Sequence, residues 1–195
     1  MPEIEEIALF PLHTVLFPGG PLPLRIFEPR YLDMVRRTLR TQTAFGVVLL
    51  QAEATAGVPA STSSIGTSAR IADFYSLPDG LLGITCHGVR KFQVRGRRVQ
   101  SDGLSFGEID WLAAESAIEL PGEFQHLGHL LRKVLPELGN FYADVSKRFD
   151  DSAWVGYRLA EILPLSLPDK QYCLELDDPL ARLRHLSPLI QRAPE

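Results

Sequence analysis

Five prolines and a Gly-Gly pair interrupt the apolar stretch between residues 7 and 31, which reads IALFPLHTVLFPGGPLPLRIFEPRY. Proline has no backbone N–H, so within a sheet it is confined to edges, strand starts and bulges, and otherwise it lies in turns. One long helix is therefore excluded over this stretch. It predicts short strands, ended first by Pro11 and then by a turn at 18–20. The three apolar runs cover 4–10, 15–17 and 22–27.

A helix is expected directly after the third run. Pro29 suits the first helical position, where its missing N–H costs nothing. The apolar residues Leu32, Val35 and Leu39 recur at helical spacing and are expected on the buried face. The helix is expected to end near Arg40, since cations are favoured close to a helix C-terminus.

Strand patterns and turn residues continue to about residue 113. Turns are expected at Pro78-Asp79-Gly80 and at Asp102-Gly103, where glycine supplies a positive φ. The small polar residues of 52–64 predict a surface loop. Many short strands with Gly/Pro turns favour a barrel or sandwich-like β module. The expected strands cover 44–50, 66–74, 81–87, 88–99 and 104–111.

After residue 115 the apolar period changes from two to 3.6, which predicts helices. The first stripe runs from Phe124 to Leu138, and a second helix is expected to start at Asp151 or Ser152. A short helix is expected over 169–176, and the last helix follows an N-cap at Asp178. We therefore expect two subdomains. These are a barrel or sandwich-like β module with one early helix over 1–115 and a helical bundle over 116–195.

Composition narrows the functional classes. The chain has 195 residues, 45% of them hydrophobic, and a net charge of −4, which does not favour nucleic acid through bulk electrostatics. Two cysteines, Cys86 and Cys173, show no metal-ligand spacing and fit a reducing compartment. No apolar run approaches the roughly 18 residues of a membrane span, and no signal peptide is evident. We expect a cytoplasmic protein without a membrane partner, metal or other cofactor.

Four segments in this order resemble the N-terminal domain of the Lon ATP-dependent protease. The resemblance covers nearly the whole chain and implies the fold class α+β. It implies a β-barrel module similar to PUA domains, followed by an α-helical subdomain. The segments are LFPLHTVLFPGGPLPLRIFEPRY (9–31), FGVVLL (45–50), IGTSARIADFYSLPDGLLGITCHGVRKFQV (65–94) and LPLSLPDKQYCLELDDPLARLRHL (163–186).

The catalytic parts of that family are not expected here. Full Lon proteases continue into an AAA+ ATPase and a Ser–Lys protease domain. The sequence contains no G-x-x-x-x-G-K-[ST] loop to cradle phosphates. Ser146-Lys147 are consecutive positions on a segment expected to face solvent, which is not the setting of a serine nucleophile. We expect a stand-alone form without the ATPase and protease domains, and not an enzyme.

The resemblance implies recognition of unfolded or degron-bearing proteins. The chain would then be a non-catalytic protein- or peptide-binding module, an adaptor or scaffold in protein quality control. Apolar residues of the opening stretch are candidates for a peptide groove, although we expect most of them to be buried in the core. These candidates are Leu16, Phe17, Leu22 and Phe27.

A basic strand supports an alternative, RNA binding by a PUA-like barrel. Five cations lie within residues 90–98 with no acid among them, and basic patches supply phosphate contacts. Against this, residues 1–115 hold 11 Lys/Arg and 12 Asp/Glu, and the strand offers no aromatic pair for stacking on bases. The five cations are Arg90, Lys91, Arg95, Arg97 and Arg98.

Two further polar groups have simple structural explanations. Glu28 can hold an arginine across the junction of strand and helix, with Tyr31 packed below, or these residues can form a recognition site. His126 and His129 lie three apart on an expected helix, a spacing that can bring two imidazoles to one metal. No third ligand is evident nearby, so we expect no metal site.

Overall fold

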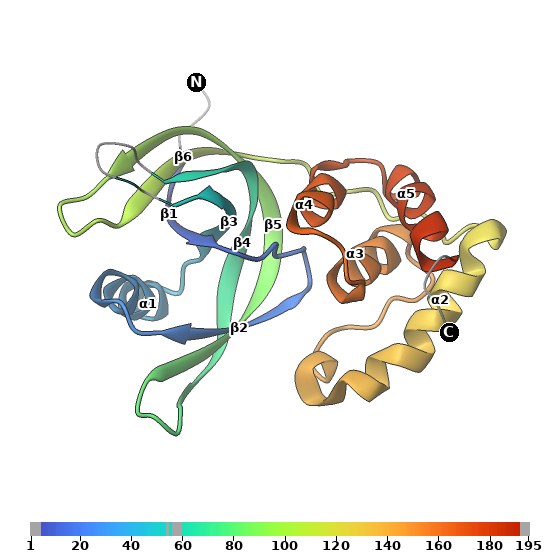
Figure 1. The fold of residues 1–195 in the computed structure, drawn as a ribbon, viewed down its shortest axis with the longest axis horizontal. Helices are drawn as coiled ribbons and strands as arrows, with labels where there is room; N and C mark the ends of the chain where they lie inside the picture. Colours follow the sequence, from blue (N-terminus) through green and yellow to red (C-terminus); the bar gives the residue numbers. More distant parts are fainter. Residues whose placement is uncertain (1–4, 54, 56–59, 192–195) are drawn as a thin grey trace. The chain divides into compact units, whose positions relative to one another are not determined.

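The computed structural model describes residues 5–53, 55 and 60–191. The chain divides into two compact units, Met1–Ala113 and Ala114–Glu195. The division expected from the sequence lies two residues further on, after residue 115. Figure 1 shows the elements of each unit coloured along the chain.

The described residues of the first unit form one six-stranded sheet with the order β2-β5-β4-β3-β1-β6. A further pairing of β5 with β6 closes β5, β4, β3, β1 and β6 into a ring, and β2 stays outside the ring on β5. Only the pairing of β1 with β3 is parallel. The strands are β1 (Glu5–Leu12), β2 (Pro21–Ile26), β3 (Phe45–Ala52), β4 (Ser61–Ser76), β5 (Leu82–Val99) and β6 (Ser105–Trp111).

The strand β1 does not end at Pro11, contrary to the sequence prediction. Its pairing with β6 ends at Leu9, whereas Pro11 still lies opposite Val48 of β3. The missing N–H of Pro11 therefore breaks no bond with β6, and the strand continues. Residues 15–17 were expected to be extended as a strand, but they belong to the loop between β1 and β2.

The turn predicted at 18–20 is confirmed. Gly20 donates its N–H to the carbonyl of Phe17 at 3.0 Å, and Gly19 has a φ of 72°. Proline followed by a glycine of positive φ is the arrangement of a type II turn. The turns at Gly80 and Gly103 likewise have positive φ, as the sequence predicts.

One glycine has a different role from the one its sequence suggested. Residues 81–87 and 88–99 were expected as two strands, but β5 runs unbroken through Gly88. Gly88 exchanges backbone hydrogen bonds with Gly19 and Gly20, at 2.8 and 2.9 Å. A Cβ on Gly88 would lie 2.2 Å from the carbonyl oxygen of Phe17. The glycine is required for this close approach, not to end a strand.

The variant Gly88→Ala is expected to lower the free energy of unfolding by about 2 kcal/mol, because the colliding atom is backbone and cannot rotate away. Chemical denaturation measures the change. Gly122→Ala is the matched control, since a Cβ there meets nothing within 4 Å. Equal stability of both variants would show that the loop at 17–20 shifts without cost.

The early helix is α1 (Pro29–Thr41), as predicted. Its buried residues are Tyr31, Met34, Val35 and Thr38, and Leu32 is partly buried against the same core, so of the three predicted residues only Leu39 is misplaced. The rings of Phe10 and Tyr31 stack with centroids 4.0 Å apart, which fixes the helix on the barrel core. Leu39 is 38% exposed and turns away from that core.

The predicted loop at 52–64 agrees only in part with the structure. The strand β3 extends to Ala52, and β4 begins at Ser61, so residues 61–64 are paired and not in a loop. Residues 54 and 56–59 lie outside the described part of the chain.

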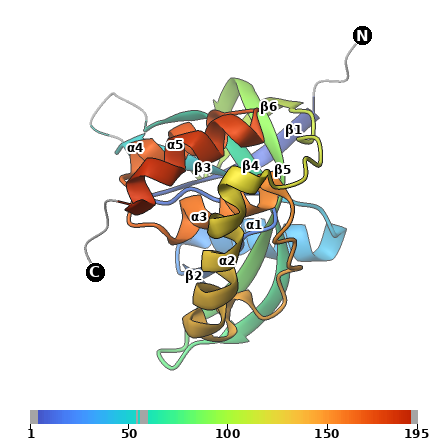
Figure 2. The same ribbon diagram turned by 90° about the vertical axis from the view of Figure 1, so that its right-hand side faces the viewer.

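The second unit is helical in its described residues, which confirms the α+β class. Figure 2 shows its helices from a second side. Asp151 caps α3 by accepting from the N–H groups of Ala153 and Trp154, and Asp178 accepts from Leu180, both as predicted. The helices are α2 (Gln125–Val134), α3 (Ser152–Ile162), α4 (Leu167–Glu175) and α5 (Pro179–Gln191), with short 3₁₀ segments at Gly122–Phe124 and Leu135–Tyr142.

Candidate functional site

The four candidate groove residues lie in different environments. Leu16 and Phe17 are buried, at 3% and 0% exposure, and offer no surface to a ligand in this structure. Leu22 is partly buried against the barrel core. Phe27, directly after β2, is 62% exposed. Of the four, Phe27 alone presents a large apolar surface.

Two more exposed aromatic residues lie near Phe27. Phe74 and Tyr75 on β4 are 60% and 40% exposed. Tyr75 lies opposite Gly83 of β5, and Gly83 lies opposite Arg25 of β2, so these positions form a row across three strands. Because neighbouring strands are about 4.8 Å apart, β2 and β4 are separated by about 10 Å here. We call Phe27, Phe74 and Tyr75 the aromatic end of the barrel.

The three aromatic side chains are divided between the two faces of the sheet. Side chains alternate along a strand, so Phe27 lies on the same face as Arg25, and Tyr75 joins them through the row at Gly83. A Cβ on Gly83 would be 2.3 Å from the Tyr75 ring, so the ring lies directly over this glycine. Phe74 is opposite Ile84, a buried core residue, and therefore projects from the core face.

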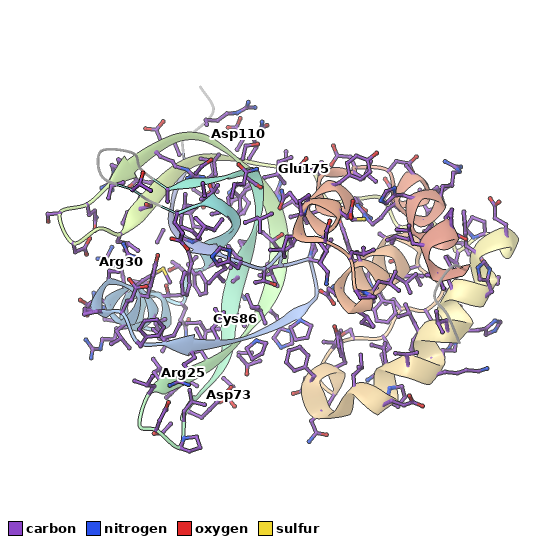
Figure 3. All side chains as sticks on the ribbon, in the orientation of Figure 1. Arg25, Arg30, Asp73, Cys86, Asp110 and Glu175 are labelled. Carbon is purple, nitrogen blue, oxygen red and sulfur yellow. The ribbon has the colours of Figure 1, made fainter. Side chains whose placement is uncertain are left out.

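The hydrogen-bonded hairpin of β4 and β5 supports the aromatic end. Leu77 donates to the carbonyl of Leu81 at 2.8 Å, which closes the turn between β4 and β5. Asp79 in this turn forms an ion pair with Arg25 of β2. Figure 3 shows Arg25 and Asp73 together at this end of the unit. The exposed rings are thus held by paired strands.

The free edge of β2 is unsuited to pairing with another strand. Leu22, Leu24 and Ile26 alternate with Pro21 and Pro23 along its pairing with β5. Since proline cannot donate, the backbone groups that bond to β5 come from the alternating leucine and isoleucine positions. The outward positions 21 and 23 then lack N–H groups. A ligand is therefore expected to contact side chains here, and not to extend the sheet.

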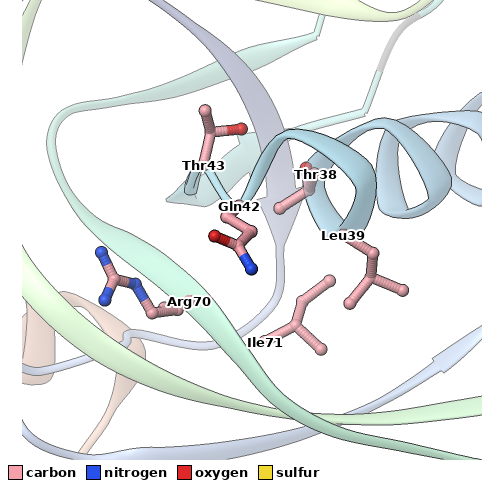
Figure 4. A pocket seen from close by; sticks show the side chains of 6 residues that line it. All are labelled: Thr38, Leu39, Gln42, Thr43, Arg70 and Ile71. Carbon is pink, nitrogen blue, oxygen red and sulfur yellow. The ribbon is translucent and has the colours of Figure 1, made fainter.

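A surface pocket of about 500 Å³ lies beside the C-terminal end of α1. Figure 4 shows the side chains around it, which come from α1, the residues after it, and β4. The lining combines hydroxyl, amide and guanidinium groups with two aliphatic side chains. Its residues are Thr38, Leu39, Gln42, Thr43, Arg70 and Ile71.

The basic strand is largely engaged within the barrel. Lys91 is buried, at 3% exposure. Arg95 pairs with Asp110 at 2.6 Å, and Arg98 pairs with Glu6 at 2.5 Å. The Arg98 guanidinium beside Glu6 also lowers the pKa of that carboxyl through their hydrogen bond. These partners neutralise the charge that RNA phosphates would need.

The other two arginines of this strand also have partners. Arg97 donates to the hydroxyl of Thr62. Arg90 donates to the carbonyl of Leu112 at 2.8 Å and lies 5.5 Å from the centre of the Trp111 ring. The arginines predicted as a basic patch therefore each interact with a different partner, and they do not converge on one phosphate site.

The junction between β2 and α1 fits the structural interpretation. Arg30 bonds to Glu28 at 2.9 Å and to the carbonyl of Gly103 at 3.0 Å. Its guanidinium carbon lies 4.8 Å from the centre of the Tyr31 ring. These contacts tie the start of α1 to the hairpin between β5 and β6.

The two cysteines are buried, whereas the two histidines considered for a metal site lie on the surface. Burial raises the pKa of the Cys86 thiol to about 12 and that of Cys173 to about 11, so neither is a ready thiolate. His126 and His129 are both exposed. Across the described residues, no group of three or more His, Cys, Asp or Glu side chains could hold a metal ion.

The sequence of the chain matches a known domain family along almost its whole length. The family model of the ATP-dependent protease La (LON) substrate-binding domain covers residues 6–192. The chain belongs to this family. The resemblance deduced from the four sequence segments is confirmed.

Solved Lon structures share this fold. A Lon N-terminal domain protein from Xanthomonas campestris superimposes with a TM-score of 0.77 at 40% identity, over 98% of this chain and 100% of that one. The N-terminal domain of a Mycobacterium avium complex Lon protease gives a TM-score of 0.70 at 15% identity, over 97% and 100%. These matches agree with the PUA-like barrel and helical subdomain expected for Lon.

The curated relatives of this chain are named Lon protease. The Lon protease of Phenylobacterium zucineum is 27% identical over 197 residues, and that of Escherichia coli K12 is 23% identical over 201 residues. In both cases the chain spans about a quarter of the relative's length, 24%.

Within the described residues, no helix is long and apolar enough to cross a membrane.

Sequence reasoning found one residue of the aromatic end and missed the others. Phe27 was one of four apolar residues of the opening stretch that were considered for a peptide groove. Phe74 and Tyr75 were assigned only to a strand. Two adjacent aromatic residues just before a Pro-Asp-Gly turn place one ring on each face of a hairpin arm. That pattern is a signal for exposed rings, since a hairpin tip projects beyond the barrel.

Proposed function

We propose that this Lon-family chain is a non-catalytic module that binds exposed segments of unfolded or degron-bearing proteins. It would serve as an adaptor or scaffold in protein quality control. The observation that carries the proposal is the aromatic end, where Phe74 and Tyr75 on the hairpin of β4 and β5, and Phe27 directly after β2, all leave apolar surface exposed at one end of the barrel. Membership in a family named for substrate binding supports it.

The physical basis is the apolar surface that these rings leave in water. Burying apolar surface is favourable by about 25 cal/mol per Å², and an aromatic side chain buries about 150–250 Å² when fully covered. A half-covered ring can thus contribute up to about 2–3 kcal/mol before the ordering costs of association are subtracted. Such contacts are non-directional, so they suit ligands that share apolar character and not one sequence.

The double variant Phe27→Ser with Phe74→Ser is expected to weaken binding of an unfolded protein at least about tenfold, since two ring contacts are lost. The ligand is a reduced, carbamidomethylated protein carrying a fluorophore, and anisotropy gives the Kd. Exposed apolar residues can be replaced with little effect on stability, which thermal unfolding checks.

Val99→Ser is the matched control. Val99 is also 62% exposed, but it lies at the end of β5, in the other hairpin (Figure 1). Its variant is expected to bind as the original chain does. Equal weakening by both substitutions, or no binding by the original chain, would contradict the proposal. The same samples are expected to leave the unfolded protein uncleaved with or without ATP.

A further inference from the structure

The pocket beside α1 has a lining suited to more than apolar contact. Leu39 and Ile71 supply aliphatic surface, and the hydroxyl residues Thr38 and Thr43 lie beside them. Gln42 and Arg70 complete the lining (Figure 4). Its volume of about 500 Å³ falls in the range of ligand sites, about 300–1,000 Å³. This mixture of aliphatic surface and a few polar groups is typical of a binding site.

Arg70 is the charged group of this pocket. It is exposed, and its guanidinium makes no ion pair or hydrogen bond in the part of the chain that the structure describes. Other exposed arginines of the barrel, such as Arg25 and Arg95, pair with carboxylates. A guanidinium without an internal partner favours an anionic ligand, because its planar donors match a carboxylate.

The C-terminal end of α1 repels an anion in the pocket only weakly. A helix C-terminus carries partial negative charge on its free carbonyl groups. Here the carbonyl of Thr38 accepts from the N–H groups of both Gln42 and Thr43. The hydroxyl of Thr41 donates to the carbonyl of Arg37 at 2.8 Å. These bonds occupy carbonyls of the last turn, so the full charge of Arg70 dominates the pocket.

Gln42 has a backbone conformation that its side chain does not favour. Its φ is 54°, the only positive φ among the non-glycine residues of 5–53, 55 and 60–191. Glycine adopts this left-handed conformation at lower cost and is the usual residue after a helix. The conformation of this turn therefore does not explain why residue 42 is a glutamine and not a glycine. Its amide points into the pocket in Figure 4, where it can donate a hydrogen bond to a ligand.

The pocket is continuous with the aromatic end along β4. Ile71 lies opposite Cys86 and Phe74 lies opposite Ile84, and both partners are buried in one core cluster. Ile71 and Phe74 thus share the core face of β4, because the pairing register shifts between Ile71 and Asp73 and interrupts the regular alternation. They are three residues apart, which corresponds to about 10 Å along a strand. An extended ligand that covers Phe74 reaches the pocket after about three residues.

We propose that this pocket binds the carboxylate of an aspartate or glutamate side chain within the unfolded segment, about three residues from an apolar side chain on Phe74. Arg70 is the ion partner, and the Gln42 amide donates a further hydrogen bond. Leu39 and Ile71 contact the residue next to the acid. This inference rests on the proposed function, since it names a chemical preference of the same surface.

Two peptides of twelve residues test the preference. Both are acetylated and amidated, carry one fluorophore, and place leucine three residues from either glutamate or glutamine. The glutamate peptide is expected to bind about tenfold more tightly at low salt, and added salt is expected to reduce this ratio. Arg70→Gln is expected to abolish the ratio, and Gln42→Gly is expected to reduce it several-fold without loss of thermal stability.

Arg184→Gln is the matched control, because Arg184 is an exposed arginine of the helical unit. It is expected to keep the full preference. Equal binding of the two peptides, or an Arg70→Gln variant that still prefers glutamate, would overturn the proposal. So would a third peptide, with glutamine and a free C-terminal carboxylate, that binds as tightly as the glutamate peptide in an Arg70-dependent way, since the pocket would then bind chain ends.

Failure of this inference is distinguishable from failure of the proposed function. A chain that binds the carbamidomethylated protein through Phe27 and Phe74, yet shows no preference between the peptides, retains the function and loses the pocket assignment. A chain that binds neither the protein nor any peptide contradicts both.

Discussion

The variant Arg182→Ala is expected to lower the free energy of unfolding of the helical unit by about 3–5 kcal/mol, since breaking a buried ion pair leaves a charge without compensation. Arg182 is fully buried. Its two terminal nitrogens donate to the carboxylate of Glu115 at 2.9 and 2.6 Å, and its Nε donates to the carbonyl of Cys173 at 2.7 Å. The guanidinium also lies 4.0 Å from the centre of the Tyr157 ring.

Alanine removes all of these contacts at once. The Glu115 side chain, only 5% exposed, then loses its guanidinium partner, and the carbonyls of Cys173 and Leu176 lose a donor. Denaturant unfolding followed by tryptophan fluorescence measures the loss. Arg184→Ala, on the exposed side of the same helix, is the control and is expected to change stability by less than about 0.5 kcal/mol.

A compensated variant separates the charge from the packing. Arg182→Met with Glu115→Gln removes both charges and keeps most of the volume, so it is expected to recover much of the stability lost by alanine. If alanine itself costs less than about 1 kcal/mol, water reaches Glu115 and the pair is not an essential contact.

Local chemistry explains the parts of the fold that the sequence predicts well. Gly19, Gly80 and Gly103 sit at positive φ where turn rules expect glycine. The caps at Asp151 and Asp178 depend only on residues two or three positions away. Such signals involve short-range geometry, so they can be deduced from neighbouring residues.

Contacts between distant residues explain what the sequence did not predict. Arg98 finds its partner Glu6 ninety-two residues away, and this pairing removes a charge that looked available for RNA. Gly88 looked like the start of a strand because its contact with Phe17 comes from another part of the chain. A basic run or an isolated glycine shows the residue type but not its partner.

The candidate site shows the same limit. Leu16, Phe17 and Phe27 have similar apolar character in the sequence, yet only Phe27 is exposed, because the loop before β2 is packed inward whereas the chain directly after β2 is not. Arg70 and Gln42 lie twenty-eight positions apart in the sequence and line one pocket only because β4 passes the end of α1. Which apolar side chains are exposed, and which distant residues line one pocket, depend on the tertiary fold. Sequence periodicity alone does not predict either.

Stability is also expected to depend on pH through Glu161 in α3. Burial raises the pKa of its carboxyl to about 7 from an ordinary value of 4.5, although the nearby Arg158 guanidinium opposes the change. Arg158 donates to Glu161 at 2.8 Å, and the hydroxyl of Tyr142 donates to it at 3.2 Å. Because the folded carboxyl holds its proton more tightly, its contribution is present below pH 4.5 and is lost as the pH rises to about 7.

The variant Glu161→Gln isolates this contribution, since an amide resembles the protonated acid and does not titrate. One pKa unit corresponds to about 1.4 kcal/mol, so the original chain is expected to lose up to about 3 kcal/mol relative to the glutamine variant between pH 4.5 and 7.5. Denaturant midpoints of both chains across this range give the difference. Tyr142→Phe removes a hydrogen bond that favours the ionised form and is expected to extend the loss to higher pH. A difference that instead shrinks with rising pH would show that attraction to Arg158 outweighs burial.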